Sequence, residues 1–100
     1  MQTITAEELK ARIDKGEKPF IIDVREQYEF DEFNINGHLI PLGNIQSALP
    51  ELEEHTDDEI IIHCRSGARS AAAVDFLTKQ GFTNVKNLTG GMIAWQAVEG

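Results

Sequence analysis

Two continuous apolar runs constrain the fold of this chain more than any other feature of its sequence. Residues 20–22 read Phe-Ile-Ile and are followed by Asp23 and Val24, and residues 60–62 read Ile-Ile-Ile. A strand with one face in solvent alternates apolar and polar residues, whereas an uninterrupted run is typical of a strand buried on both faces, as in a parallel sheet. The runs therefore predict a parallel sheet that is covered on both sides.

Two predicted helices carry recognisable signals at their ends. Thr5 is expected to cap the N-terminus of the first helix, and Glu8, three residues later, completes a capping box. Gly16 is expected to end this helix. Gly81 is expected to end a later one, with Phe82 placed to make the hydrophobic contact of a Schellman motif.

Strand and helix signals alternate along the chain. We expect strands at 2–4, 20–24, 37–42, 60–62 and 85–88, and helices at 5–16, at 26–30, at the apolar positions Ile45, Leu49 and Leu52, at 70–81 and at 90–95. This alternation predicts an α/β fold with a parallel sheet. Ligands bind beyond the carboxyl ends of the strands in such sheets, and Cys64 lies at such an end.

Length and charge limit the functions that the chain can have. Its 100 residues fit one domain, which is expected to span residues 1–100. A net charge of −8 argues against nonspecific binding to nucleic acid or to an anionic membrane. No run is apolar and long enough to span a bilayer, and no N-terminal segment has the pattern of a signal peptide. The single cysteine favours a reducing compartment, so we expect a cytoplasmic protein.

The segment after the second apolar run combines a cysteine with an anion-binding pattern. It is expected to pass from strand to loop to helix start between Cys64 and Ser70. Loop amides at a helix N-terminus have no intrahelical partner, and together with the helix dipole they form an anion site. Gly67 permits a tight turn, and Arg65 and Arg69 add positive charge. We therefore predict that Cys64 is a nucleophilic thiolate at neutral pH.

A different interpretation treats Cys64 as a small buried apolar side chain, which is what free cysteines in proteins often are. A position in a hydrophobic core does not require a glycine and two arginines within the next five residues. The pattern of the segment therefore favours a reactive cysteine.

Three segments resemble the rhodanese family. Residues 62–70, Ile-His-Cys-Arg-Ser-Gly-Ala-Arg-Ser, resemble its active loop. Residues 23–26 together with 29–30 resemble its early signature, and residues 88–91 followed by Trp95 resemble its closing signature. Three motifs in the right order and at the right intervals are more specific than one, and they extend the resemblance over nearly the whole chain.

The resemblance implies a doubly wound, five-stranded parallel sheet flanked by helices, and a thiosulfate sulfurtransferase activity that needs no cofactor. Cys64 would take the outer sulfur of a donor such as thiosulfate, and its persulfide would pass that sulfur to a thiol or to cyanide. The residues implied to bind the persulfide and the donor are Arg65, Ser66, Gly67, Ala68, Arg69 and Ser70. With one cysteine in the chain the acceptor must be external, and a sulfur-accepting protein is one candidate.

Two other functions share parts of this pattern. Cysteine phosphatases place five residues between the cysteine and the arginine, whereas four residues, 65–68, intervene here. The shorter loop predicts a smaller pocket, matched to a sulfur atom rather than to a phosphate or to the arsenate of an arsenate reductase. A non-catalytic rhodanese-like binding module usually lacks the cysteine, which is present in this chain.

Several polar residues outside the loop are interpreted as structural. Asp23 and Arg25 follow the first buried strand, and we expect them to form a supporting ion-pair network that includes Glu29. His63 precedes Cys64 on a strand, so its side chain points to the opposite face and is expected to pack or to support the loop. No group of His, Cys, Asp and Glu residues has the spacing of a metal site, so we predict no metal.

Overall fold

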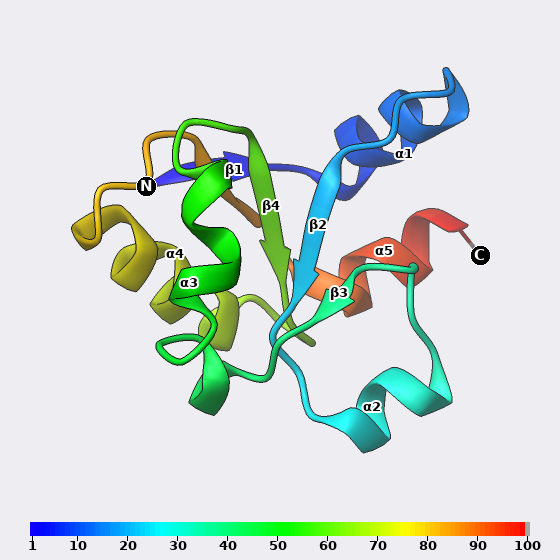
Figure 1. Cartoon of the computed structure of the whole chain (residues 1–100). Coiled ribbons are helices and arrows are strands. Elements are labelled where there is room, and N and C mark those ends of the chain that lie inside the picture. Colours follow the sequence, from blue (N-terminus) through cyan, green and yellow to red (C-terminus); the bar gives the residue numbers. More distant parts are fainter. Residues whose placement is uncertain (100) are drawn as a thin grey trace.

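Five parallel strands form one sheet in the order β1-β5-β4-β2-β3 in the computed structural model, which describes residues 1–99 (Figure 1). The strands are β1 (Gln2–Ile4), β2 (Phe20–Asp23), β3 (His38–Leu39), β4 (Ile60–His63) and β5 (Val85–Leu88). The two apolar runs of the sequence form the neighbouring strands β2 and β4, with Ile21 opposite Ile61. The predicted α/β class with a five-stranded parallel sheet is confirmed.

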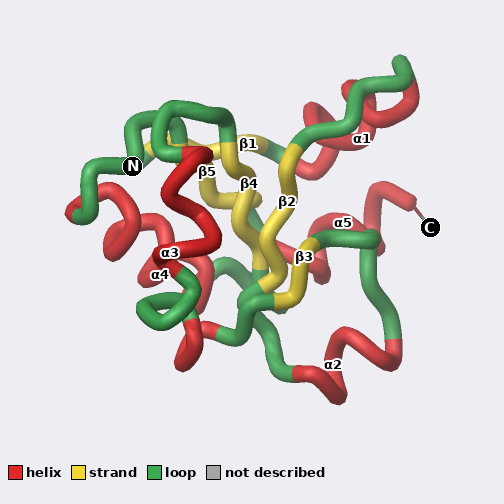
Figure 2. The backbone as a smooth tube through the Cα atoms, in the orientation of Figure 1, coloured by secondary structure: helices red, strands yellow, loops and turns green. Residues whose placement is uncertain are grey.

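Helices cover both faces of this sheet, which confirms the doubly wound architecture (Figure 2). The helices are α1 (Ala6–Asp14) and α5 (Gly91–Glu99) on one face, α3 (Leu49–Leu52) and α4 (Ala68–Lys79) on the other, and α2 (Gln27–Glu32) beyond the carboxyl ends of the strands. Two short 3-10 turns span Leu42–Asn44 and Glu53–His55. Within residues 1–99, no helix has the length and apolar character needed to cross a membrane.

The packing of β4 explains its uninterrupted apolar run. Successive residues of a strand point to opposite faces. Ile60 and Ile62 accordingly pack in the core formed with α3 and α4, whereas Ile61 packs in the core formed with α1 and α5. All three side chains are fully buried, and each burial stabilises the fold by about 1.5–3 kcal/mol. Trp95 is buried in the second core.

The predicted helix ends are confirmed in detail. The Glu8 amide donates to Thr5 Oγ1 at 3.1 Å, and the Thr5 amide donates to Glu8 Oε1 at 2.9 Å, which is a complete capping box. At the end of α4, Gly81 has a φ of +97°. The Phe82 amide donates to the Leu77 carbonyl at 3.1 Å, the bond that defines a Schellman motif.

The apolar positions Ile45, Leu49 and Leu52 do not belong to one helix, so this expectation is wrong. Only Leu49–Leu52 is α-helical, and Ile45 lies in the turns that precede it. Pro50 lies in the first turn of α3, where its missing N–H costs no intrahelical hydrogen bond. Proline is therefore favoured at the start of a helix, and α3 begins at Leu49, the residue before it. Ile45 and Leu52 are nevertheless buried in the same core. The spacing of the apolar residues reports their burial rather than a continuous helix.

The strand expected at residues 37–42 is shorter in the structure. Only His38–Leu39 forms β3, although the amides of Ile40 and Leu42 still donate to the carbonyls of Asp23 and Val24, at 2.9 and 3.1 Å. In a regular parallel ladder the second acceptor would lie two residues after the first, and here it lies one residue after it. The ladder therefore loses its regular pattern after two residues.

Candidate active site

The loop after β4 places Cys64 at the carboxyl end of the sheet, where the sequence predicts a site. β4 ends at His63, and Gly67 is already the N-cap of α4. Gly67 has a φ of +111°, a left-handed conformation that is costly for a residue with a Cβ. This turn brings the first amides of α4 back to the Cys64 side chain, which is 1% exposed.

Hydrogen-bond donors surround the Cys64 sulfur. The amides of Gly67 and Ser70 donate to Sγ at 3.1 and 3.4 Å, and the Ser70 hydroxyl oxygen lies 3.4 Å from it. Burial raises the pKa of the Cys64 thiol. Hydrogen bonds from the Ser70 hydroxyl and from the amides of Ser70, Gly67 and Ser66 outweigh burial, so the pKa lies below its ordinary value. The anion-binding loop that the sequence predicts is therefore directed at the sulfur itself.

We expect the alkylation of Cys64 by iodoacetamide to rise with pH through a midpoint below about 8.5, the pKa of an ordinary thiol. Only the thiolate reacts, so a lowered pKa moves the rise in rate to lower pH. The rate is measured against pH on the folded protein and, as the matched control, on the same chain unfolded in urea. Coincident midpoints for the two states would contradict the prediction.

Asn87, on β5, is part of the site, although no motif in the sequence singles it out. Its Oδ1 accepts from the Ser70 hydroxyl at 2.6 Å, and its Nδ2 donates to the Gly67 carbonyl at 3.2 Å. The side chain is 8% exposed. An asparagine inside a short buried strand needs hydrogen-bond partners. The signal that could have identified Asn87 is a polar residue inside the predicted strand 85–88.

The start of α5 binds the backbone of the cysteine loop. The Met92 amide donates to the Cys64 carbonyl at 2.9 Å, and the Ile93 amide donates to the Arg65 carbonyl at 3.0 Å. Gly91 has a φ of +55°, and a Cβ there would lie 2.5 Å from the Cys64 carbonyl oxygen. The free amides of this helix N-terminus therefore hold the loop rather than face a ligand.

The two arginines of the loop differ in their partners. Arg69 Nη1 and Nη2 donate to the two carboxylate oxygens of Glu29 at 2.7 and 2.9 Å. The hydrogen bonds from Arg69 lower the pKa of Glu29 to about 2. The expectation that Glu29 joins Asp23 and Arg25 is wrong, because Arg69 takes both of its oxygens. Arg65 is exposed and forms no ion pair or side-chain hydrogen bond among residues 1–99.

A buried ion pair lies beneath the loop on the β2 side. Arg25 Nη2 donates to Asp23 Oδ2 at 2.8 Å and to the Phe33 carbonyl at 2.7 Å. The His63 ring is fully buried, with Nε2 3.7 Å from Asp23 Oδ2 and Nδ1 3.5 Å from the Cys64 carbonyl. Burial lowers the pKa of His63 although Asp23 opposes the effect, which favours the neutral ring at pH 7. The structural-support role of Asp23 and Arg25, and substrate binding by residues 65–70, stay predictions.

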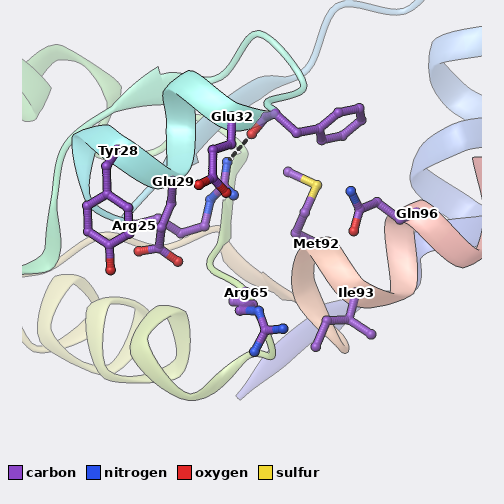
Figure 3. A pocket seen from close by; sticks show the side chains of 9 residues that line it. Arg25, Tyr28, Glu29, Glu32, Arg65, Met92, Ile93 and Gln96 are labelled. Carbon is purple, nitrogen blue, oxygen red and sulfur yellow. Dashed lines mark hydrogen bonds between the residues drawn. The ribbon is translucent and has the colours of Figure 1, made fainter.

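A pocket of about 410 Å³ lies between α2 and the start of α5, beside the cysteine loop (Figure 3). Tyr28 and Glu29 on α2 lie across it from Met92 and Ile93 on α5, and Arg65 lies between the two helices. The residues that line it are Arg25, Tyr28, Glu29, Glu32, Phe33, Arg65, Met92, Ile93 and Gln96. The loop borders this pocket through Arg65, the residue that follows Cys64.

A model of the Rhodanese-like domain family matches residues 5–98. A protein from Allochromatium vinosum named Sulfurtransferase is 37% identical over 98 residues, which cover 92% of this chain and 85% of that protein. A crystal structure of a rhodanese-like domain protein from Staphylococcus aureus has a TM-score of 0.86 at 33% identity, and the match covers 95% of this chain and 91% of that one.

Other relatives are longer than this chain. YrkF from Bacillus subtilis, which carries the provisional name of a sulfur carrier protein, is 42% identical over 93 residues. That match covers 92% of this chain and 49% of YrkF. A Mycobacterium tuberculosis relative is 38% identical over 94 residues, and that match covers 93% of this chain and 24% of the relative. The chain therefore spans half or less of the length of the first curated relatives that it matches.

Proposed function

The chain belongs to the family of rhodanese-like domains, and on that basis we propose that it is a sulfurtransferase that acts through a persulfide on Cys64. It would move a sulfane sulfur from thiosulfate or a similar donor to a thiol or cyanide. One observation carries the proposal: the Cys64 sulfur lies at the carboxyl end of the sheet and accepts hydrogen bonds from the Gly67 and Ser70 amides. The relative from Allochromatium vinosum that is named a sulfurtransferase supports the same reaction class.

In the first half-reaction, the Cys64 thiolate attacks the outer sulfur of the donor. A bond forms between Sγ and that sulfur, and the sulfur–sulfur bond of the donor breaks. With thiosulfate, sulfite leaves with the bonding electron pair, and the negative charge of the thiolate passes to the persulfide. No proton moves in this step, so a thiol that is already ionised needs no general base. The amides that bind Sγ would stabilise the anionic persulfide.

In the second half-reaction, an external nucleophile takes the outer sulfur. The chain contains one cysteine, so no second thiol of its own can resolve the persulfide. A small thiolate or cyanide attacks the outer sulfur, and the Cys64 thiolate leaves with the electron pair of the broken bond. The provisional name of YrkF supports a sulfur-accepting protein as a further acceptor. A reducing compartment such as the cytoplasm would keep Cys64 available for the cycle.

The persulfide is tested by intact-mass measurement. We expect the reduced protein, incubated with thiosulfate and freed of excess donor, to gain the mass of one sulfur atom, and to lose it again on addition of cyanide. Cys64→Ala, which has no sulfur nucleophile, should gain nothing. A wild-type protein that stays unmodified with every sulfane-sulfur donor tried would rule out the mechanism.

A further inference from the structure

The Asn87 side chain links β5 to the cysteine loop inside the protein. Asn87 lies opposite Ile62 in the register of β5 and β4. Its side chain therefore points to the same face of the sheet as Ile62, which packs in one core with Cys64. Asn87 is 8% exposed and Ser70 is fully buried. Water does not compete with the hydrogen bonds of this group, so each bond depends on which member donates.

The direction of these hydrogen bonds follows from the chemistry of their partners. The Gly67 carbonyl can only accept, so the Asn87 atom 3.2 Å from it is the amide nitrogen. The other end of the amide is then an oxygen, which can only accept, so the Ser70 hydroxyl donates to it at 2.6 Å. Ser70 has one proton. While Asn87 accepts that proton, Ser70 Oγ can only accept from Cys64, whose Sγ lies 3.4 Å away.

This arrangement suits a thiol at Cys64 better than a thiolate. A thiol has a proton to donate to Ser70 Oγ. On ionisation that proton leaves to solvent, and Sγ becomes an acceptor that faces the lone pairs of the Ser70 oxygen. The Ser70 proton can turn to Sγ, but Asn87 Oδ1 then loses its donor, and no other group within residues 1–99 donates to it. A buried acceptor without a donor is costly, so Asn87 opposes the ionisation of Cys64.

The Gly67 carbonyl does not depend on Asn87 for its hydrogen bonding. It also accepts from the Ala71 amide at 3.0 Å, as part of α4. An apolar side chain in place of Asn87 would therefore leave this carbonyl paired and would release the Ser70 proton. The Ser70 hydroxyl lies 3.2 Å from the same carbonyl, but a charged acceptor forms the stronger hydrogen bond. The released proton should turn to the Cys64 thiolate.

We propose that Asn87 is a positioning residue for sulfur transfer, whose amide oxygen holds the Ser70 proton away from Cys64 and so restrains the ionisation of the sulfur. This role rests on the sulfur transfer proposed above. A thiolate becomes a weaker nucleophile as the pKa of its thiol falls, and the best attacking thiol has a pKa near the pH around it. Hydrogen bonds from the loop amides lower the pKa of Cys64, and Asn87 limits this effect.

Other charged and titratable side chains surround the cysteine loop. They are Arg65 in the loop, Arg69 on α4, Glu29 on α2, His63 on β4, and Asp23 and Arg25 at the end of β2. Within residues 1–99, none of these side chains forms a hydrogen bond with the side chain of Asn87 or Ser70. Substitutions at Asn87 should therefore leave their effect on Cys64 unchanged.

The test is a double-mutant cycle in which the alkylation of Cys64 by iodoacetamide is measured against pH. Asn87→Leu removes the acceptor of the Ser70 proton. The midpoint of the rise in rate should fall by about one pH unit, because the Ser70 hydroxyl then donates to a charged sulfur rather than to a neutral oxygen. The rate at high pH should be about threefold lower, since nucleophilicity falls with pKa. In Ser70→Ala there is no proton to release, so adding Asn87→Leu should leave the midpoint unchanged.

Asn87→Asp separates this role from that of holding the loop. It keeps an oxygen that accepts from Ser70 but, like the leucine variant, loses the amide nitrogen that binds the Gly67 carbonyl. Its midpoint should not fall below that of the wild type. A midpoint that is unchanged in Asn87→Leu, that falls in Asn87→Asp as well, or that falls equally in the Ser70→Ala background would overturn this inference.

Two further measurements keep the result decisive. Thermal unfolding shows whether each variant is folded, and Asn87→Ala, which also removes the acceptor, replaces the leucine variant if that variant does not fold. Alkylation by iodoacetamide needs no sulfur donor. The expected midpoints in a protein that no sulfane-sulfur donor modifies would therefore contradict sulfur transfer alone and leave the control of Cys64 by Asn87 standing.

Discussion

Gly91→Ala should unfold at a temperature at least about 10 °C below that of the wild type, and its Cys64 should react more slowly with iodoacetamide at pH 7. A left-handed φ of +55° costs a residue with a Cβ about 1–2 kcal/mol. The new Cβ would also lie 2.5 Å from the Cys64 carbonyl oxygen and 2.7 Å from that of Arg65, and relieving such an overlap costs about 1–3 kcal/mol. Together these costs are a large share of a total stability of about 5–15 kcal/mol.

The same substitution at Gly16 separates the two costs. Gly16 also has a positive φ, of +92°, but a Cβ there would meet nothing within 4 Å. Gly16→Ala should therefore show the conformational cost alone and keep the alkylation rate of Cys64. Thermal unfolding and alkylation at pH 7 are measured on both variants. Equal melting temperatures for the two variants would mean that the overlap of the new Cβ with the cysteine loop carries no cost.

The parts of the fold that are encoded locally were predictable. The capping box of Thr5 and Glu8 and the turn at Gly81 involve residues a few positions apart, and the side-chain and backbone groups that form them are fixed by the local sequence. The burial of β2 and β4 was also predictable, because an apolar run without alternation fits only a strand covered on both faces. The turns around Ile45 were not, because apolar spacing does not distinguish a helix from other buried segments.

The site, like the fold, has features that the local sequence predicts and features that it does not. Cys64 and Gly67 lie in one short segment, so their position in an anion-binding loop follows from the sequence around them. The pairing of Arg69 with Glu29 joins residues 40 positions apart, and the bond from Ser70 to Asn87 joins residues 17 apart. Such partners are chosen by the tertiary fold, so the local sequence shows which polar groups the loop carries but not which distant residues pair with them.

Ser70→Ala should raise the pKa of Cys64 and slow persulfide formation at neutral pH by about ten- to a hundredfold. Ser70 Oγ lies 3.4 Å from Sγ, and its single proton, which Asn87 Oδ1 accepts at 2.6 Å, can rotate to a thiolate and then stabilises the ionised form only. A hydrogen bond to a charged group contributes about 1.5–3 kcal/mol, so its loss lowers the thiolate fraction by about ten- to a hundredfold as long as the pH is below the pKa.

The pH dependence of the Ser70→Ala rate distinguishes this electrostatic role from a purely structural one. Above both pKa values each protein is fully ionised, so the two rates of persulfide formation should converge at high pH. A deficit that persists there would mean instead that Ser70 acts by holding the loop through Asn87, whose Oδ1 accepts its hydroxyl at 2.6 Å. Ser66→Ala is the matched control, because it removes the same group from an exposed position of the same loop and should leave the pH profile unchanged.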